Sequence, residues 1–190
     1  MGLVGWIVLG VVVLLLFWGV AIYNGLVRLR ALVREGFSGI TVQLRRRADL
    51  IPNLVSTVEG YATHEREVLD QVTAHRADAA SARGVAATAQ ADGAFSAMLG
   101  RLMAVAEAYP DLKADANFRQ LQEELSEIEE HLQSARRYYN ATVRDLNTKI
   151  QSFPNVLVAG PLGFHEEESY QDADASIQSA PKVSFGAAKA

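Results

Sequence analysis

The chain of 190 residues contains no cysteine, five prolines and four histidines. Without cysteine it can form no disulfide, no thiolate metal site and no lipoprotein anchor, which needs a cysteine after the apolar segment. This absence says nothing about the redox compartment. Any imidazole chemistry would depend on four residues, His64, His75, His131 and His165.

Charge is also missing from the first 27 residues, because the first charged side chain is Arg28. The run from Leu3 to Ile22 contains no polar residue. A bilayer core about 30 Å thick needs roughly 20 apolar residues in a helix, so the run predicts a transmembrane anchor at residues 1–25. A cleaved signal peptide is the alternative, because Gly19-Val20-Ala21 resembles a peptidase site. Against it, no basic residue precedes the run, which exceeds the roughly 7–15 apolar residues of a usual signal peptide.

Three arginines, Arg28, Arg30 and Arg34, lie just after the apolar run, whereas only the α-amino group precedes it. The positive-inside rule therefore predicts an anchor in the bacterial inner (plasma) membrane with the bulk of the chain in the cytoplasm. The extracytoplasmic side is the alternative. The same arginines are expected to form a basic collar facing anionic lipid, each contributing on the order of 1 kcal/mol. A solvated helix face is the other interpretation of this collar.

Beyond the anchor, apolar residues recur every three or four positions in three stretches. These stretches are Leu26–Val72, Phe95–Tyr109 and Phe118–Phe153. The spacing predicts helices, and no segment gives a convincing strand pattern. Long helices bury such stripes by packing antiparallel. The expected fold is therefore all-α, with the transmembrane helix continuing into a long up-and-down bundle of three to four helices over residues 26–164.

Proline, glycine and alanine indicate where these helices bend or end. Pro52 predicts either one kinked helix or two nearly collinear helices, the second beginning with Asp49 as its N-cap. Segment 77–94 is rich in Ala, Ser, Thr and Gly and is expected to be the tip where the chain reverses. Residues 155–164 are apolar and are expected to pack back onto the bundle.

The last segment, residues 165–190, is polar and acidic, and it is expected to be a disordered tail. One patch in this tail has apolar content and is a candidate docking motif for a partner protein. It contains Pro181, Lys182, Val183 and Phe185. A chance occurrence is the alternative interpretation.

Residues capable of catalysis do not converge in the sequence. Glu127 and His131 are four apart, whereas a ferritin-like di-metal site repeats Glu-x-x-His on two helices. His64-Glu65 begins a His-Glu-x-x-His pattern, but Val68 replaces the second histidine. We therefore expect no enzyme activity, no cofactor and no metal. Nucleic-acid binding is not expected either, because the net charge is −4 and no aromatic residues alternate with the arginines.

Polar residues beside the apolar stripes form a candidate interaction network. Its members are Arg47, Asp49, Asn53, His64, Glu65, Glu107, Tyr109, Glu129, Arg136, Tyr139 and Asn140. The structural interpretation is that charged side chains of facing helices pair and fix the helix register. The functional interpretation is a polar surface for a partner protein or for another copy of the chain.

Several segments together resemble the LemA family. They include QLRRRADLIPNLV at 43–55, EAYPDLKA at 107–114 and RRYYN at 136–140, with shorter matches at 23–27, 60–61, 64–65, 118, 153–154 and 181–185. The resemblance implies a single N-terminal span followed by a long antiparallel helical bundle. It implies no established catalytic activity, and some relatives in magnetosome-forming bacteria are linked to building internal membranes.

These observations predict a non-enzymatic, membrane-anchored helical scaffold that self-associates or recruits partners and shapes or organises the membrane. The small residues Ala21 and Gly25 on one face of the span would assist formation of a homo-oligomer. The alternative is a sensory or regulatory module that transmits a signal through its anchor. Pro52 and the Gly-containing tip would then serve as hinges.

Overall fold

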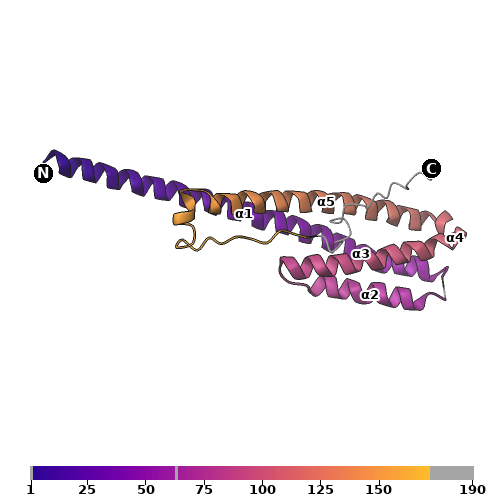
Figure 1. The fold of residues 1–190 in the computed structure, drawn as a ribbon. Helices are drawn as coiled ribbons and strands as arrows, with labels where there is room; N and C mark the ends of the chain where they lie inside the picture. Colours follow the sequence, from indigo (N-terminus) through magenta and orange to yellow (C-terminus); the bar gives the residue numbers. More distant parts are fainter. Residues whose placement is uncertain (1, 63, 172–190) are drawn as a thin grey trace, which may run out of the picture.

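The computed structural model describes residues 2–62 and 64–171, and this part of the chain is helical with no strand. The elements are α1 (Leu3–Glu59), α2 (Arg66–Ser81), α3 (Val85–Glu107), α4 (Pro110–Ala114), α5 (Ala116–Gln151) and the 3-10 turn η1 (Asn155–Leu157). The long helices α1, α2, α3 and α5 alternate in direction (Figure 1). The predicted all-α fold, with the apolar helix continuing into an up-and-down bundle, is confirmed.

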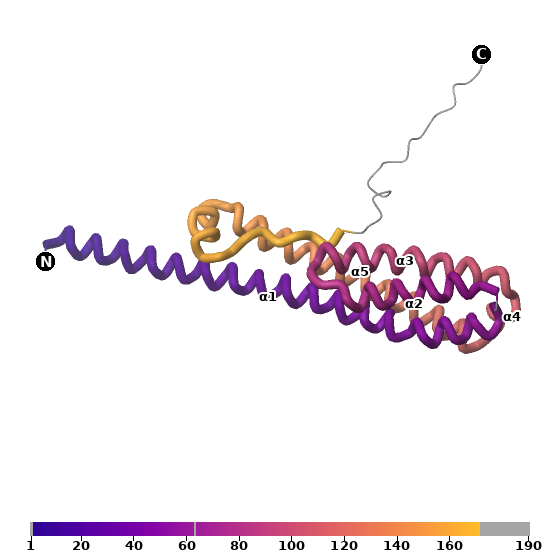
Figure 2. Tube along the Cα trace, turned by 90° about the horizontal axis from the view of Figure 1, so that it is seen from below, coloured from indigo at the N-terminus to yellow at the C-terminus, as the bar shows by residue number. Residues whose placement is uncertain are grey.

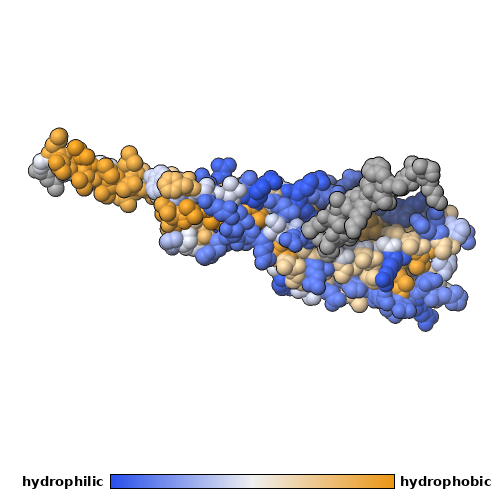
Figure 3. All heavy atoms as spheres, viewed as in Figure 1, coloured by the Kyte–Doolittle hydropathy of each residue, from blue (hydrophilic) through white to orange (hydrophobic). Residues whose placement is uncertain are grey.

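Helix α1 joins the apolar run to the bundle without a break. Its apolar window has none of its residues buried, and by length and composition the helix is able to cross a membrane. Ile22 is the first buried residue of α1, and Leu26, Val33 and Ile40 follow it into the core. The apolar run therefore projects from the bundle as an isolated hydrophobic rod (Figure 3).

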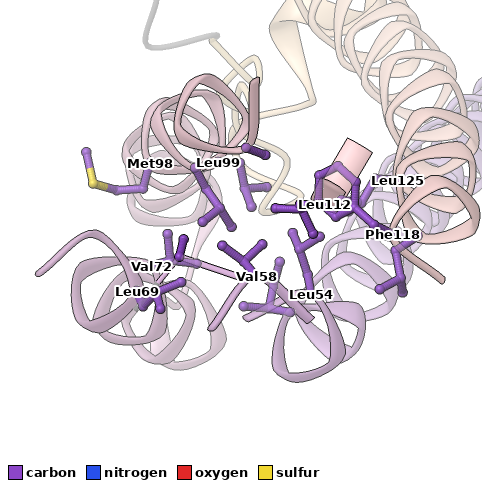
Figure 4. Close-up of a cluster of buried hydrophobic side chains, with 14 of the residues drawn as sticks. Leu54, Val58, Leu69, Val72, Met98, Leu99, Leu112, Phe118 and Leu125 are labelled. Carbon is purple, nitrogen blue, oxygen red and sulfur yellow. The ribbon is translucent and has the colours of Figure 1, made fainter. Parts of the chain in front are cut away.

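The bundle has two zones along its length. Near the apolar run, α1 packs chiefly against α5 (Figure 2), and the core there includes Leu26, Tyr139 and Leu146. Farther away α2 and α3 join, and a second core forms around side chains such as Leu54 and Phe118 (Figure 4). Each zone buries the apolar stripe that α1 or α5 could not bury alone.

Helices α1 and α5 approach each other closely at Gly36. A Cβ atom placed on Gly36 would lie 3.1 Å from the Tyr139 Cα atom, closer than such atoms normally come. The neighbouring Phe37 ring packs against the Tyr139 ring with centroids 5.9 Å apart. The absence of a side chain at Gly36 thus permits this close contact between the two helices.

The chain first reverses at a different place from the predicted one. Helix α1 ends at Glu59, and α2 begins at Arg66 and runs back along it, so the predicted stretch Leu26–Val72 is divided between two antiparallel helices. Segment 77–94 is also mostly helical: it forms the end of α2 and the start of α3, which are separated at residues 82–84. The reversal predicted within this segment is therefore present, but it is confined to residues 82–84, because alanine is the strongest helix former and the rest of the segment is helical. The reversal uses Gly84, whose φ of 80° suits glycine.

Pro52 is accommodated inside α1 by a hydrogen bond from another helix. Proline has no amide hydrogen, so the carbonyl of Ala48 loses its usual helical donor. Arg76 of α2 supplies a replacement, because its Nε atom donates to that carbonyl at 2.7 Å. Helix α1 remains one helix, and the alternative in which Asp49 caps a new helix is wrong.

Residues 165–171, which we call the strap, correct the prediction of a disordered tail beginning at residue 165. Asn140 of α5 accepts from the Tyr170 amide at 2.8 Å and donates to the Tyr170 carbonyl at 3.0 Å. Asn147 makes the same pair of bonds with Glu167, both at 2.9 Å. Each asparagine imitates a peptide group, so the polar strap is held through its backbone. Residues 172–190, with the motif Pro181, Lys182, Val183 and Phe185, lie outside the described residues.

Candidate functional site

A group of charged and polar residues, centred on the buried side chains Arg47 and Asp92, connects α1, α3, α5 and the strap. We call it the hub, and its members are Arg47, Asp92, Glu129, Arg136 and Tyr170. Asp92 of α3 has only 1% of its surface exposed, and its two carboxylate oxygens accept from Arg47 and Arg136 respectively. The Tyr170 hydroxyl also donates to Asp92, at 2.7 Å. One carboxylate therefore holds side chains from three other segments.

Arg47 extends the hub to the edge of the bundle. This residue is fully buried, and its Nη1 atom donates to Glu129 at 2.6 Å and to Ser96 at 3.0 Å. Its guanidinium lies 4.9 Å from the centroid of the Phe95 ring. A cation over an aromatic face is stabilised by the ring quadrupole, so Phe95 supports the charge that α1 buries.

The charges within the hub balance, because two arginines face two carboxylates. The Arg136 guanidinium lies 5.4 Å from the Tyr170 ring centroid. Burial, together with the charge of Asp92, raises the pKa of the Tyr170 hydroxyl, which keeps it a neutral donor. Removing one side chain from a buried network of this kind destabilises the fold, because it leaves another charge without its partner. The network therefore favours one arrangement of the helices.

A second tyrosine fixes the strap next to the hub. The Tyr139 hydroxyl donates to the Glu168 carbonyl at 2.8 Å. Burial is the main cause that raises the pKa of Tyr139 to about 12, and the carboxylates of Glu167 and Glu168 add to it. The strap is therefore attached through neutral hydroxyls at ordinary pH.

The structure brings together five members of the predicted polar network. Arg47, Glu129 and Arg136 meet in the hub, while Tyr139 and Asn140 hold the strap. The other six residues do not join them. Asp49 and Asn53 are exposed on α1, His64 and Glu65 lie in the turn before α2, and Glu107 and Tyr109 lie where α3 gives way to α4.

The sequence-based prediction missed the two residues that complete the hub, Asp92 and Tyr170. Asp92 lies three residues before Phe95 and seven before Leu99, so it shares their buried helix face. An acidic residue on an apolar face was a usable signal. Tyr170 is an aromatic residue in a polar stretch, and no spacing rule connects it to α3.

A cavity of about 430 Å³ lies beside Arg47, between α1, α2 and the start of α3. Its walls combine apolar side chains with arginines, and they include Phe37, Leu44, Phe95, Arg45, Arg76 and Arg83. The Arg47 Nε atom is buried and has no hydrogen-bond partner within residues 2–62 and 64–171. A small molecule with an apolar body and an anionic group matches such walls. Among the described residues, no group of three or more His, Cys, Asp or Glu side chains is arranged to hold a metal ion.

The residues of the predicted basic collar lie just beyond the apolar run. Arg28 and Arg34 are exposed on α1. Arg30 is partly buried, and its guanidinium lies 4.5 Å from the centroid of the Phe164 ring. Two of the three arginines are thus open to a membrane surface, whereas the third also packs against the end of the bundle.

The comparisons with known proteins agree with this architecture. The model of the LemA family matches residues 36–185. Magnetosome protein MamQ 2 of Paramagnetospirillum magneticum is 26% identical over 179 residues, an alignment that covers 80% of this chain and 66% of that protein. Protein LemA of Metamycoplasma hominis is 27% identical over 156 residues, covering 80% of this chain and 69% of the relative. The chain therefore spans just under two thirds of the length of the magnetosome relative.

Proposed function

This chain belongs to the LemA family, and from that premise we propose that it is a non-enzymatic, membrane-anchored scaffold that self-associates or recruits partner proteins and thereby organises the membrane. The observation that carries the proposal is the continuity of α1. A single helix of 57 residues contains both the exposed apolar run and one side of the bundle. Any assembly of bundles would therefore also position the membrane helices.

The hub supports this function because it makes the bundle a defined body. It ties the anchor helix to α3, α5 and the strap through charges that are satisfied in one arrangement. A partner that binds any face of such a bundle is thereby fixed relative to the anchor. The relatives named as magnetosome proteins support the membrane-organising part of the proposal.

The proposed location is the bacterial inner membrane, with the bundle on the cytoplasmic side. Arg28 and Arg34 are exposed directly after the apolar run, as the positive-inside rule requires of a cytoplasmic flank. A cysteine introduced at the exposed residue Glu123 reports the side, because the chain has no other cysteine. An impermeant maleimide added to intact spheroplasts is expected to leave it unlabelled until the membrane is opened. Labelling before opening would place the bundle outside.

Crosslinking in intact cells tests the scaffold function. The full chain is expressed in light and heavy isotopic forms in the same cells, crosslinked, and examined by mass spectrometry. We expect mixed light and heavy crosslinks, which only two copies can form, or the same partner protein in every replicate. A chain that gives neither, and that is strictly monomeric by mass photometry in detergent, would contradict the proposal.

The cavity beside Arg47 favours a second candidate, a sensory module that responds to a small anionic ligand. Arg47 belongs to both the cavity wall and the hub, so a ligand there would act on the residue that joins α1 to α3. Spin labels on α1 and α5 would report a helix shift while a panel of amphipathic carboxylates is added. A change in their distance would support this candidate, and unchanged distances across the panel would contradict it.

A further inference from the structure

The segment that follows α5 forms an uncharged turn held by hydrogen bonds, residues 153–164, which we call the apolar turn. Buried Asn155 fixes its start, because its Nδ2 atom donates to the Lys149 carbonyl at 2.9 Å. The Phe164 amide donates to the Ala159 carbonyl at 2.9 Å and closes its end. Gly163, with φ of 76°, then directs the chain into the strap. This turn has a defined shape rather than that of a loose loop.

The apolar turn exposes large hydrophobic side chains that nothing in the bundle covers. Phe153 is 81% exposed and Leu157 is 65% exposed, and Val156 and Leu162 are also exposed. Among the described residues beyond the apolar run of α1, one other large aliphatic side chain, Val42, is exposed to this degree. Exposed apolar groups gathered in one place indicate a surface that meets another apolar phase.

Contacts with α1 place this turn at the end of the apolar run. The Phe164 ring meets the Tyr23 ring edge to face, with centroids 5.7 Å apart, and it also contacts Arg30. The residues from Leu3 to Ala21 span about 28 Å at 1.5 Å per residue, close to the roughly 30 Å of a bilayer core. The apolar turn therefore lies where a membrane crossed by α1 would end, and its hydrophobic surface adjoins the rod (Figure 3).

The charge pattern agrees with this placement. No charged residue occurs between Lys149 and His165, so the apolar turn can enter the interfacial region without burying an ionised group. Arg28 is exposed near the same level of α1 and is able to meet lipid phosphates. Binding of a second protein copy would explain why these side chains are exposed. It would not explain why the apolar turn lies next to the end of the apolar run of α1.

We propose that the apolar turn is a second membrane-contacting element, which inserts Phe153, Val156, Leu157 and Leu162 into the bilayer interface beside α1. The occupant of this surface is lipid. The inference rests on the proposed membrane anchoring by α1. With two contacts, the bundle is fixed against rotation about α1 and stands directly on the membrane.

Site-directed spin labelling of the full chain tests this proposal, since the natural sequence has no cysteine to remove. Single labels are placed at Leu157→Cys in the apolar turn, at Phe17→Cys in the apolar run and at Glu123→Cys, an exposed position on α5. Each variant is reconstituted in phosphatidylcholine and phosphatidylglycerol nanodiscs that hold one chain, and collisions with oxygen and with a water-soluble nickel complex are measured. We expect the label at residue 157 to lose nickel collisions relative to residue 123 and to gain oxygen collisions, as at residue 17.

The outcomes separate this proposal from the anchor on which it rests. Water-like collisions at residue 157 together with lipid-like collisions at residue 17 would overturn the apolar-turn contact alone. Water-like collisions at residue 17 would overturn membrane anchoring itself. Protection of residue 157 only in vesicles that hold many chains would assign the surface to a second copy and contradict the proposal.

A charged substitution supplies an independent readout. Leu157→Asp alters an exposed side chain, so the bundle is expected to keep its helical content and thermal unfolding midpoint. A label at Val156→Cys is expected to become accessible to nickel in this variant. Val42→Asp, a matched change at an exposed position on α1, is expected to leave that label protected. Equal accessibility in both variants would contradict insertion of the apolar turn.

Discussion

At the scale of single residues, Asp92 determines how the helices are held together. It is buried in α3 and receives hydrogen bonds from α1, α5 and the strap. Arg47 and Arg136 were predicted members of a polar network because arginines beside apolar stripes need partners. Their shared acid, Asp92, was missed because its alanine-rich segment was assigned to the tip of the chain, although its spacing from Phe95 and Leu99 places it on a buried helix face. Burial of a polar side chain depends on the neighbours that cover it, and pattern alone does not supply them.

Replacing this acid tests the hub directly. Asp92→Ala leaves the buried Arg47 and its neighbour Arg136 without their common carboxylate, and breaking a buried pair in this way costs about 3–5 kcal/mol. For a chain of this size that corresponds to a fall in Tm on the order of 10 °C. Thermal unfolding followed by circular dichroism in detergent measures the change. Asp70→Ala, at an exposed site on α2, is the control, and an equal effect of both variants would disprove the role of the hub.

Tyr139 and Tyr170, the two tyrosines that attach the strap to the bundle, predict a loss of stability at alkaline pH. The folded state raises the pKa of both Tyr139, to about 12, and Tyr170, whereas unfolded tyrosine ionises near pH 10. The contribution of Tyr139 is therefore complete below about pH 10 and is lost as the pH rises toward 12, whereas that of Tyr170 declines over the same range and at higher pH. A fluorophore at Ser169→Cys is expected to become mobile in this range. In the Tyr139→Phe variant, the part of the alkaline loss of stability that comes from ionisation of Tyr139 is expected to disappear. An unchanged alkaline transition in this variant would show that Tyr139 does not contribute to it.

At the scale of elements, periodicity predicted the helices but not the position of their turns. The stripe through Pro52 kept its phase, and α1 is indeed continuous there. The same stripe continued beyond Glu59, yet the chain reverses before Arg66. Two antiparallel helices joined by a short turn can carry one uninterrupted apolar pattern, because both present that face to a common core. Turn position then depends on packing across the bundle.

The bond between Arg76 and Ala48 predicts a coupling between α1 and α2. Arg76→Ala leaves the Ala48 carbonyl without a donor and is expected to cost about 1–3 kcal/mol, because an unsatisfied buried group loses its solvation. In the Pro52→Ala variant the new amide of residue 52 donates to the Ala48 carbonyl. Arg76→Ala is therefore expected to cost about 1 kcal/mol less in that variant than in the natural chain. Unfolding of the four proteins in this double-mutant cycle measures the difference. Additive effects would show that Arg76 does not compensate for Pro52.

At the scale of the whole molecule, the anchor and the bundle share one helix. The apolar run and the bundle were predictable separately from hydropathy and from helical spacing. Their continuity was also predicted, because apolar residues at helical spacing begin at Leu26, directly after the run. The return of residues 155–164 onto the bundle was also predicted, and Ala159 and Phe164 are buried there. The strap was not recognised as a fixed part of the fold, since its contacts join residues distant in sequence. The contacts of Phe164 with Tyr23 and Arg30 join this part of the chain to α1 just after the apolar run.

The distance between labels on either side of the membrane boundary tests this continuity most directly. Phe17→Cys and Ser38→Cys are 21 residues apart on α1 and both exposed, as are the control pair Glu123→Cys and Arg144→Cys within α5. A continuous helix places each pair about 32 Å apart at 1.5 Å per residue. Double electron–electron resonance in nanodiscs is predicted to give narrow distributions of similar width at that distance for both pairs. A broad or shorter distribution for α1 beside a narrow one for α5 would show that the helix breaks at the membrane and would contradict the account.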